Sequence, residues 1–201
     1  MELTYSDIKN SVKRLCFLTD SEMESYEAAV IEAVNYAMLE LCLTYPITEI
    51  YEIQRTTPAD TGYDRYDMKE LTEAMGKDFM GVYGVNSVMG IDSDGLAFNM
   101  QCTVIKERYV LLSKKLTGSV MIFYKVYPPR ITSQSPGNLK TGFPAQAANL
   151  LSLLIAWRIF KDDDPAKAAQ YYNEYMAEKQ SLNERQDIIS LPAVISENGI
   201  W

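Results

Sequence analysis

The stretch IAWRIFKDDDPAKAAQYY, residues 155–172, places three consecutive aspartates between two segments rich in apolar residues. Asp164 precedes Pro165, an order typical of a helix N-cap followed by the first helical residue. Asp162 and Asp163 lie at the same helix start, where the helix dipole favours negative charge by roughly 0.3–1 kcal/mol per residue. No further ligand with metal-site spacing follows nearby. We therefore interpret the run as the boundary between two helices, and not as a metal site or a catalytic cluster.

The segments on either side of this boundary predict a helix pair. Residues 144–161 are apolar almost all round, so we expect this helix to be the most buried element. Pro144 is well placed near its first position. The second helix is expected from about Pro165 to Leu182. The apolar stripe of this second helix consists of Ala168, Tyr172, Tyr175 and Leu182.

The N-terminal part of the chain predicts another helix pair. Residues 4–18 carry apolar side chains at helical spacing. Thr19 and Glu22 then form a T-x-x-E capping box, which predicts a second helix from that point to about Leu43. Pro46 follows the expected helix end.

From Ile47 to about Ile131 the pattern changes to short strands and turns. Asp94 and Gly95 form a good hairpin turn between two short apolar runs. The sequence DSDG around them also resembles the start of a calcium loop. Leu96 and Ala97 follow, where that loop needs an oxygen ligand and a glycine, so we interpret the stretch as a turn.

These observations predict an α+β fold: a helical bundle formed from N- and C-terminal helix pairs, with an inserted antiparallel β domain at about residues 47–131. A chain of 201 residues suits one domain with an insertion. The expected parts are the N-terminal bundle helices at 1–46, the β-rich insertion at 47–131, the C-terminal bundle helices at 132–183, and an extended C-terminal arm at 184–201.

Composition and charge restrict the class of protein. The three cysteines form no CxxC pair, and no signal peptide or membrane-spanning run is visible, so we expect a soluble protein made inside a cell. The formal charge of −8 argues against tight nucleic-acid binding. Residues 1–100 carry 18 acidic and 7 basic side chains, whereas residues 101–140 carry 7 basic side chains and one acidic one. A basic segment of one copy can therefore face an acidic segment of another copy.

The sequence offers no recognisable catalytic machinery. It contains no histidine, which removes the commonest general base and the commonest zinc ligand. It also lacks a G-x-S-x-G elbow, a phosphate-binding loop and a dinucleotide fingerprint. We expect a protein that is not an enzyme and that has no metal and no cofactor, although two distant carboxylates can still meet in a fold.

The order of features in the C-terminal half resembles the head-to-tail adaptor, or connector, proteins of tailed bacteriophages. GSVMIFYKVYPPRIT reads as a tyrosine-rich strand that ends in prolines, and a loop, a proline-led apolar helix, an Asp-rich turn and DPAKAAQYYNEYMAEKQSL follow it. The N-terminal helix pair before a β-insertion is also similar. The resemblance covers most of the chain as an order of element types, and it includes no catalytic signature.

The resemblance implies a structural virion protein of the phage neck. Such adaptors form a ring below the portal protein at the capsid vertex, contact the next neck or tail protein, and extend the channel through which the genomic DNA is ejected. The DNA passes through the lumen without specific binding, and a surplus of acidic side chains suits such a channel wall. The protein would be made in the host cytoplasm and would not contact a membrane.

Two groups of residues are candidates for contacts with partners. The C-terminal arm is apolar without helical spacing, which is typical of a segment that docks on a partner; the same arm can instead pack on its own domain. The basic segment is the candidate for contacts between subunits. The expected docking residues are Ile188, Ile189, Leu191, Val194, Ile195, Ile200 and Trp201, and the expected basic patch is Lys106, Arg108, Lys114, Lys115, Lys125 and Arg130.

Other functions remain open from the sequence. A stopper or tail-completion ring, or a collar protein, has the same features. A tyrosine-rich module that binds carbohydrate or peptide is a further possibility, because aromatic rings can stack on such ligands. Its expected ring platform is Tyr83, Tyr109, Tyr124 and Tyr127.

Overall fold

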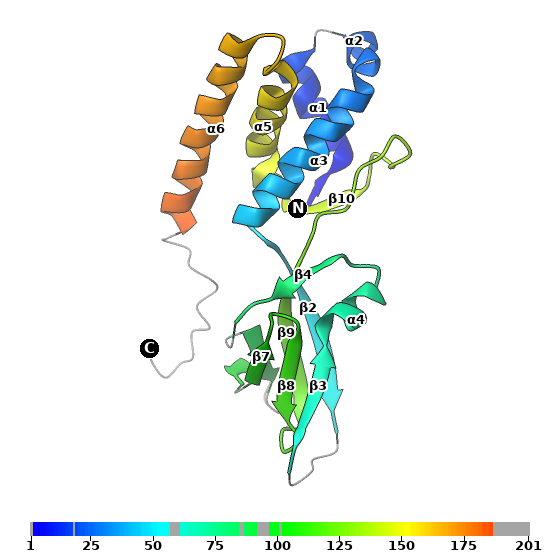
Figure 1. Ribbon diagram of the computed structural model, residues 1–201, viewed down its shortest axis with the longest axis vertical. Helices are drawn as coiled ribbons and strands as arrows, with labels where there is room; N and C mark the ends of the chain where they lie inside the picture. The colour runs from blue at the N-terminus through cyan, green and yellow to red at the C-terminus, as the bar shows by residue number, and fades with distance from the viewer. Residues whose placement is uncertain are drawn as a thin grey trace. The chain divides into compact units, whose positions relative to one another are not determined.

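The computed structural model describes residues 2–17, 19–56, 61–84, 87–91, 97–100 and 102–186, except for the side chains of residue 20 and residues 183–186. The described residues form two units. One contains the described residues up to Tyr45 together with those from Pro128 to Gln186, and it holds most of the helices (Figure 1). The other, Pro46–Tyr127, holds most of the strands.

The first unit begins with strand β1 (Glu2–Thr4) and three helices, α1 (Tyr5–Cys16), α2 (Asp20–Ser25) and α3 (Glu27–Thr44). Thr4 caps α1 in a capping box with Asp7, whose side chain accepts a hydrogen bond from the Thr4 backbone N–H. Thr19 caps α2 by accepting a hydrogen bond from the Glu22 backbone N–H at 3.2 Å. The helix start predicted at Thr19 is thus confirmed, but the helix is interrupted at Tyr26.

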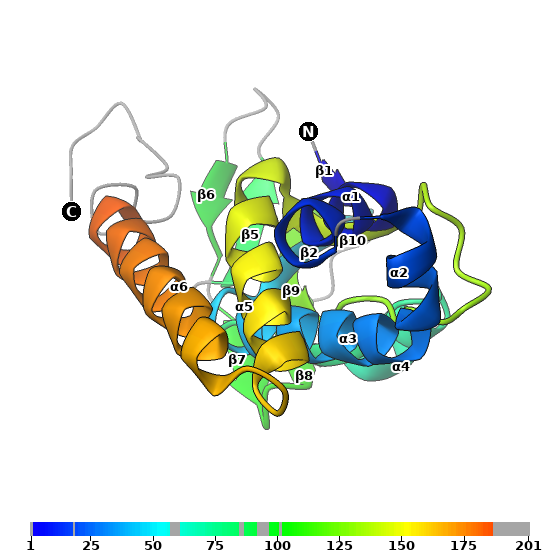
Figure 2. The ribbon, with the colours of Figure 1, turned by 90° about the horizontal axis from the view of Figure 1, so that it is seen from above.

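Helix α5 (Ala148–Phe160) is the centre of this unit, since it packs against α1, α3 and α6 (Pro165–Gln186) (Figure 2). Every residue from Leu150 to Ala156 is buried, as expected for a helix that is apolar all round. A short 3-10 helix, η2 (Ala145–Ala147), precedes it. Helix α6 buries only Ala168 and Tyr175 among its described side chains, so most of its surface is exposed.

The helical unit also contains a sheet. Strand β1 pairs antiparallel with β10 (Lys140–Pro144), and the Thr141 hydroxyl donates a hydrogen bond to the Leu3 carbonyl at 2.9 Å. Two hydrogen bonds also connect α3 to the segment before β10. The Asn35 side chain donates to the Ile131 carbonyl at 2.9 Å and accepts from the Ile131 backbone N–H at 2.8 Å, as a paired strand residue would.

The second unit is built on two antiparallel sheets. In the larger sheet, β2 (Ile47–Arg55) pairs with β9 (Gly118–Val126) over nine residues, and β5 (Val88–Ile91) and β4 (Phe79–Val82) pair with the other edge of β9. Strand β6 (Ala97–Asn99) pairs with β5, as a hairpin across the predicted Asp94–Gly95 turn requires; the turn itself lies outside the described residues. Along β9, Val120, Ile122, Tyr124 and Val126 alternate into the core.

The smaller sheet has the order β3 (Tyr63–Asp67), β8 (Tyr109–Ser113), β7 (Cys102–Ile105). Helix α4 (Met68–Glu73) follows β3 directly and begins at the N-cap Asp67. Arg55, at the end of β2, connects the two sheets. Its guanidinium donates to the Ser113 carbonyl at 2.6 Å and forms an ion pair with Asp64.

The predicted helical bundle with an inserted antiparallel β domain is wrong. The structure is a mixed fold of helices and three antiparallel sheets, in which strands and helices occur in both units. The helical unit includes the β1–β10 sheet, where the sequence suggested a helix start and a loop. The unit of strands includes α4 and divides its strands between two sheets. Three-residue and five-residue strands are too short for alternation to reveal, because the pairing with a distant segment decides their conformation.

None of the helices that the structure describes has both the length and the apolar character that a membrane span requires.

Candidate functional site

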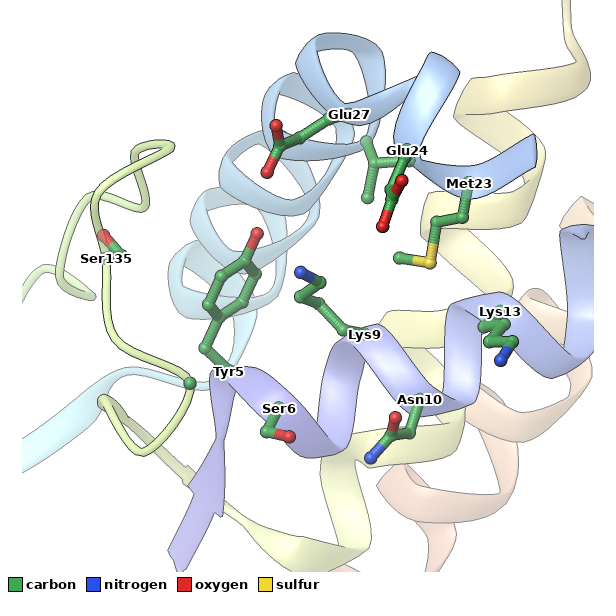
Figure 3. Close-up of a pocket in the computed structure, with 11 residues that line it drawn as sticks. Tyr5, Ser6, Lys9, Asn10, Lys13, Met23, Glu24, Glu27 and Ser135 are labelled. Atoms are coloured by element: carbon green, nitrogen blue, oxygen red, sulfur yellow. The ribbon is translucent and has the colours of Figure 1, made fainter. Parts of the chain in front are cut away.

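The helical unit has a polar pocket of about 330 Å³ between α1, the α2–α3 region and the loop before β10 (Figure 3). Helix α1 contributes two lysines, and the opposite wall contributes two glutamates. Met23 and Val30 supply apolar surface. The lining residues are Tyr5, Ser6, Lys9, Asn10, Lys13, Met23, Glu24, Glu27, Val30, Ser135 and Gly137.

Tyr5 is the most buried polar side chain of the pocket. It is 4% exposed, and Figure 3 shows its side chain together with those of Lys9, Glu24 and Glu27 around the same space. Burial raises the pKa of the Tyr5 hydroxyl, and the negative charge of Glu27 raises it further. The Lys9 ammonium lies 5.6 Å from the centre of the Tyr5 ring. Tyr5 therefore stays protonated near neutral pH and offers a hydrogen bond rather than a base.

The pKa of the Cys16 thiol is raised to about 12 by burial, and burial also raises the pKa of Cys102, so neither thiol is activated as a nucleophile. Among the residues that the structure describes, no three His, Cys, Asp or Glu side chains are close enough to hold a metal ion. The polar pocket combines opposite charges and hydrogen-bonding groups.

A second, shallower recess lies beside α3 and has a volume of about 460 Å³. Arg130 and Thr132 line it from the segment before β10, which is hydrogen-bonded to Asn35 of α3 through Ile131. Glu32 lines it from the helix, and its carboxylate accepts a hydrogen bond from Arg158 at 3.2 Å. Arg130 is exposed and belongs to the helical unit, whereas the other members of the predicted basic patch belong to the unit of strands.

Four of the remaining residues of the predicted basic patch flank β8 in the sequence, namely Lys106, Arg108, Lys114 and Lys115, and Lys125 is on β9. Arg108 forms hydrogen bonds with both Asp67 oxygens, one of them at 2.7 Å, and holds the pKa of the Asp67 carboxyl below its ordinary value. Lys125 lies 3.8 Å from a Glu107 oxygen, and Lys114 lies 3.7 Å from an Asp64 oxygen.

Two further lysines of the predicted patch have no ion pair with a described residue. Lys106 is in the β7–β8 turn and Lys115 follows β8. The structure therefore brings three of the six predicted cations, Arg108, Lys114 and Lys125, to local carboxylates.

The tyrosines proposed as a stacking platform do not share one surface. Tyr124 is fully buried in the core of its unit. The Tyr83 hydroxyl hydrogen-bonds with that of Thr48 at 2.6 Å, and Lys125 lies over its ring. The guanidinium groups of Arg65 and Arg108 lie 5.1 and 5.0 Å from the centre of the Tyr109 ring. Tyr127 is half-buried at the end of the unit. The predicted docking residues Ile188, Ile189, Leu191, Val194, Ile195, Ile200 and Trp201 lie outside the described residues.

The sequence did not reveal two apolar faces that the structure leaves open. On α3 and α6, four large apolar side chains are exposed: Leu39, Leu43, Tyr172 and Met176. On the larger sheet, Ile50 of β2 is opposite Phe123 of β9, and Met121 of β9 is opposite Met89 of β5. Ile50 is 49% exposed and the other three are half-buried. The sequence feature that could have predicted the first face is the presence of apolar residues on opposite sides of α3, because a helix at the surface of a unit buries only one of its sides.

The aspartate run has the role that the sequence predicts. The Asp164 side chain accepts a hydrogen bond from the Lys167 backbone N–H at 3.1 Å, and the Asp164 carbonyl accepts one from the Ala168 N–H at 2.9 Å. Asp162 and Asp163 are exposed beside the same helix start. The run is therefore the N-terminal boundary of α6.

No family model matches the chain, and a search of the curated proteins found no match to it.

Proposed function

We propose that the chain is a structural virion protein, a head-to-tail adaptor that forms a homo-oligomeric ring below the portal and extends the DNA channel toward the tail. The proposal rests on the resemblance in element order described above. It assigns the protein to the virion neck, with the portal protein and the next neck or tail protein as its partners.

The observation that carries the proposal is the pair of open apolar faces, one on each unit. Leu43 is 57% exposed on α3, and Ile50 is 49% exposed on β2. Each is part of a group of apolar side chains, and contiguous exposed apolar surface favours contact with another protein. A subunit that has neighbours on two sides in a ring and partners above and below needs several such surfaces.

The charge distribution supports the same proposal. The chain carries a formal charge of −8, which suits a wall along which DNA slides without binding. Lys106, Lys115 and Arg130 are the members of the basic segment that remain available for contacts between subunits, because the others face carboxylates of their own unit.

The test is the amount of this polypeptide in purified virions, measured by quantitative mass spectrometry. The virions come from the phage whose genome encodes the chain, or from a prophage induced in the host that carries it. We expect a copy number comparable to that of the portal protein and far below that of the major capsid protein. A polypeptide abundant in the infected cell but absent from virions would overturn the proposal.

A stopper or tail-completion ring would give the same copy number. An interaction screen against the portal protein and the first tail protein separates these positions. An adaptor binds the portal directly, whereas a stopper binds below the adaptor.

A further inference from the structure

The exposed apolar side chains of α3 and α6 form one face. Leu39 and Leu43 are four residues apart on α3 and are 44% and 57% exposed. Tyr172 and Met176 are four residues apart on α6 and are 40% and 46% exposed. Residues at this spacing lie on the same side of a helix, so each helix presents two neighbouring apolar side chains.

Aromatic contacts join the two helices across α5. Tyr36 lies on the same stripe of α3 as Leu39 and Leu43, and its ring centre is 6.1 Å from that of Trp157 on α5. The Trp157 ring is in turn 5.3 Å from Tyr172. Tyr36 and Trp157 thus link the two exposed pairs, and the Arg158 guanidinium lies 4.7 Å from the centre of the Tyr36 ring. We call the surface formed by Tyr36, Leu39, Leu43, Trp157, Tyr172 and Met176 the α3–α6 face.

The C-terminal end of α3 lies beside α6. The Tyr45 hydroxyl donates to the Lys179 carbonyl at 3.5 Å, and the Lys179 ammonium donates to the Thr44 hydroxyl at 3.3 Å. Helix α6 continues to Gln186, which is about 10 Å further along its axis at 1.5 Å per residue. The chain thus leaves the described structure from a helix that borders the α3–α6 face.

The segment that follows has the composition of an apolar ligand. Residues 187–201, DIISLPAVISENGIW, contain seven large apolar side chains and only two acidic ones. Fifteen residues can reach at most about 50 Å when extended. Returning from Gln186 to the level of Tyr172 requires only about 21 Å along the axis of α6. The segment is therefore long enough to cover the face.

We infer that the α3–α6 face is the docking surface for residues 187–201 of the same molecule. A covalent tether this short gives the segment an effective concentration of roughly millimolar at the face. Even a weak apolar contact is then occupied in dilute protein, whereas the same segment from a second copy at micromolar concentration would need a far tighter contact. In the free chain the segment therefore covers the apolar surface that the α3–α6 face would otherwise expose to water.

This inference does not depend on the proposed neck function. For an assembly protein it adds a regulated contact, because a partner that binds the segment uncovers the face, and a partner that binds the face releases the segment. The experiment uses purified protein alone, so its outcome is separate from that of the virion measurement.

The test is photo-crosslinking of the full-length chain at low micromolar concentration. A benzophenone amino acid replaces Leu43, which is exposed enough to accept it. The matched control carries the same amino acid at Ala177, an exposed position of α6 two places from the buried Tyr175 and off the face. After irradiation, the monomer band is digested and the adducts are mapped by mass spectrometry.

We expect adducts between position 43 and residues 187–201 in the monomer band, at a yield about tenfold above that from position 177. Equal yields from the two positions would overturn the inference, and so would adducts of position 43 that avoid residues 187–201. Adducts with this segment that occur only in the dimer band would make a second copy the occupant and would also overturn it.

A second measurement uses charge substitutions on the exposed face. Leu43→Asp and Met176→Asp should raise the rate of limited proteolysis within residues 187–201 about tenfold, because each places a charge in the contact. Ala177→Asp should leave that rate unchanged. Circular dichroism checks that all three variants keep their helices. Unchanged cleavage in both face variants would contradict the inference.

Discussion

Two tyrosines at the scale of single residues show how strongly a buried hydroxyl depends on its partner. Tyr171 and Tyr175 are one turn apart on α6. The Tyr171 hydroxyl donates a hydrogen bond to the Leu15 carbonyl at 2.9 Å. The Tyr175 hydroxyl is buried without a hydrogen-bond partner among the described residues. A buried polar group without a partner reduces stability, whereas a bonded one contributes to it.

The same substitution at these two positions should therefore have different effects on the free energy of unfolding. Tyr171→Phe removes a hydrogen bond and should lower it by about 0.5–1.5 kcal/mol. Tyr175→Phe removes an unsatisfied hydroxyl and should leave it unchanged or raise it by about 1 kcal/mol. Urea titration followed by far-ultraviolet circular dichroism measures both. An equal loss in the two variants would mean that Tyr175 also has a hydrogen-bond partner.

The Asp67–Arg108 ion pair predicts a dependence of stability on pH. The Arg108 guanidinium lowers the pKa of Asp67 in the folded protein below its ordinary value of 3.8. The unfolded chain therefore takes up the proton first, so the stabilisation is complete above about pH 5 and is lost as the pH falls through 3.8 toward the lowered folded pKa.

Asp67→Asn tests this interaction, because asparagine keeps an N-cap for α4 but removes the charge. The stability difference between wild type and variant should be constant from pH 7 to 5 and should narrow below about pH 4. Urea titrations at several pH values give this difference. A difference that widens on acidification would show that the charge of Asp67 is not stabilised in the folded state.

The sequence could not predict which charged side chains form ion pairs with each other. Asp67 and Arg108 are 41 residues apart in the chain, and they meet because β3 and β8 pair with Asp67 opposite Tyr109. Only the strand register brings them together, and no local pattern encodes it. The predicted basic patch was therefore a correct account of charge along the chain but not of the carboxylates that surround it in space.

At the scale of an element, the aspartate run makes α6 a clear test of capping. Asp164 accepts the Lys167 N–H at the helix start, whereas the neighbouring Asp163 is exposed and has no such bond to a described residue. Asp164→Ala should lower the free energy of unfolding by about 0.5–2 kcal/mol. Asp163→Ala, the matched control, should change it by at most about 0.5 kcal/mol. Equal effects would point to the helix dipole rather than to the cap.

Elements with local signals were predictable, and those that depend on distant partners were not. The cap at Thr19, the buried helix α5 and the Asp-led start of α6 follow from residues within one or two helical turns. The β7–β8 hairpin could not be predicted in this way. Lys106 and Glu107 have φ values of 53° and 50°, and the turn contains no glycine or asparagine that would indicate it in the sequence. The β1–β10 sheet joins segments at the two ends of the helical unit.

At the scale of the whole molecule, the candidate site was the least predictable feature. The sequence directed attention to the apolar C-terminal arm and to the basic segment. The open faces around Leu43 and Ile50 depend on tertiary packing, because they consist of apolar residues that remain exposed after the helices and strands have packed together. An apolar residue on a helix predicts burial but does not say whether this chain or a partner buries it.

Net charge is the property of the whole molecule that most directly tests the proposed channel. With a formal charge of −8 and local carboxylates beside Arg108, Lys114 and Lys125, the protein should repel the phosphate backbone. We expect no retardation of a duplex DNA fragment in a native gel at 150 mM salt, up to protein concentrations of about 100 μM.

A DNA-binding protein of similar size is the control for detection. Retardation at micromolar protein that weakens as salt rises would reveal a cationic surface in contact with phosphate, and a wall that holds DNA in this way cannot let it slide. Such a result would contradict the assignment to the channel, although it would leave the docking of residues 187–201 on the α3–α6 face unaffected.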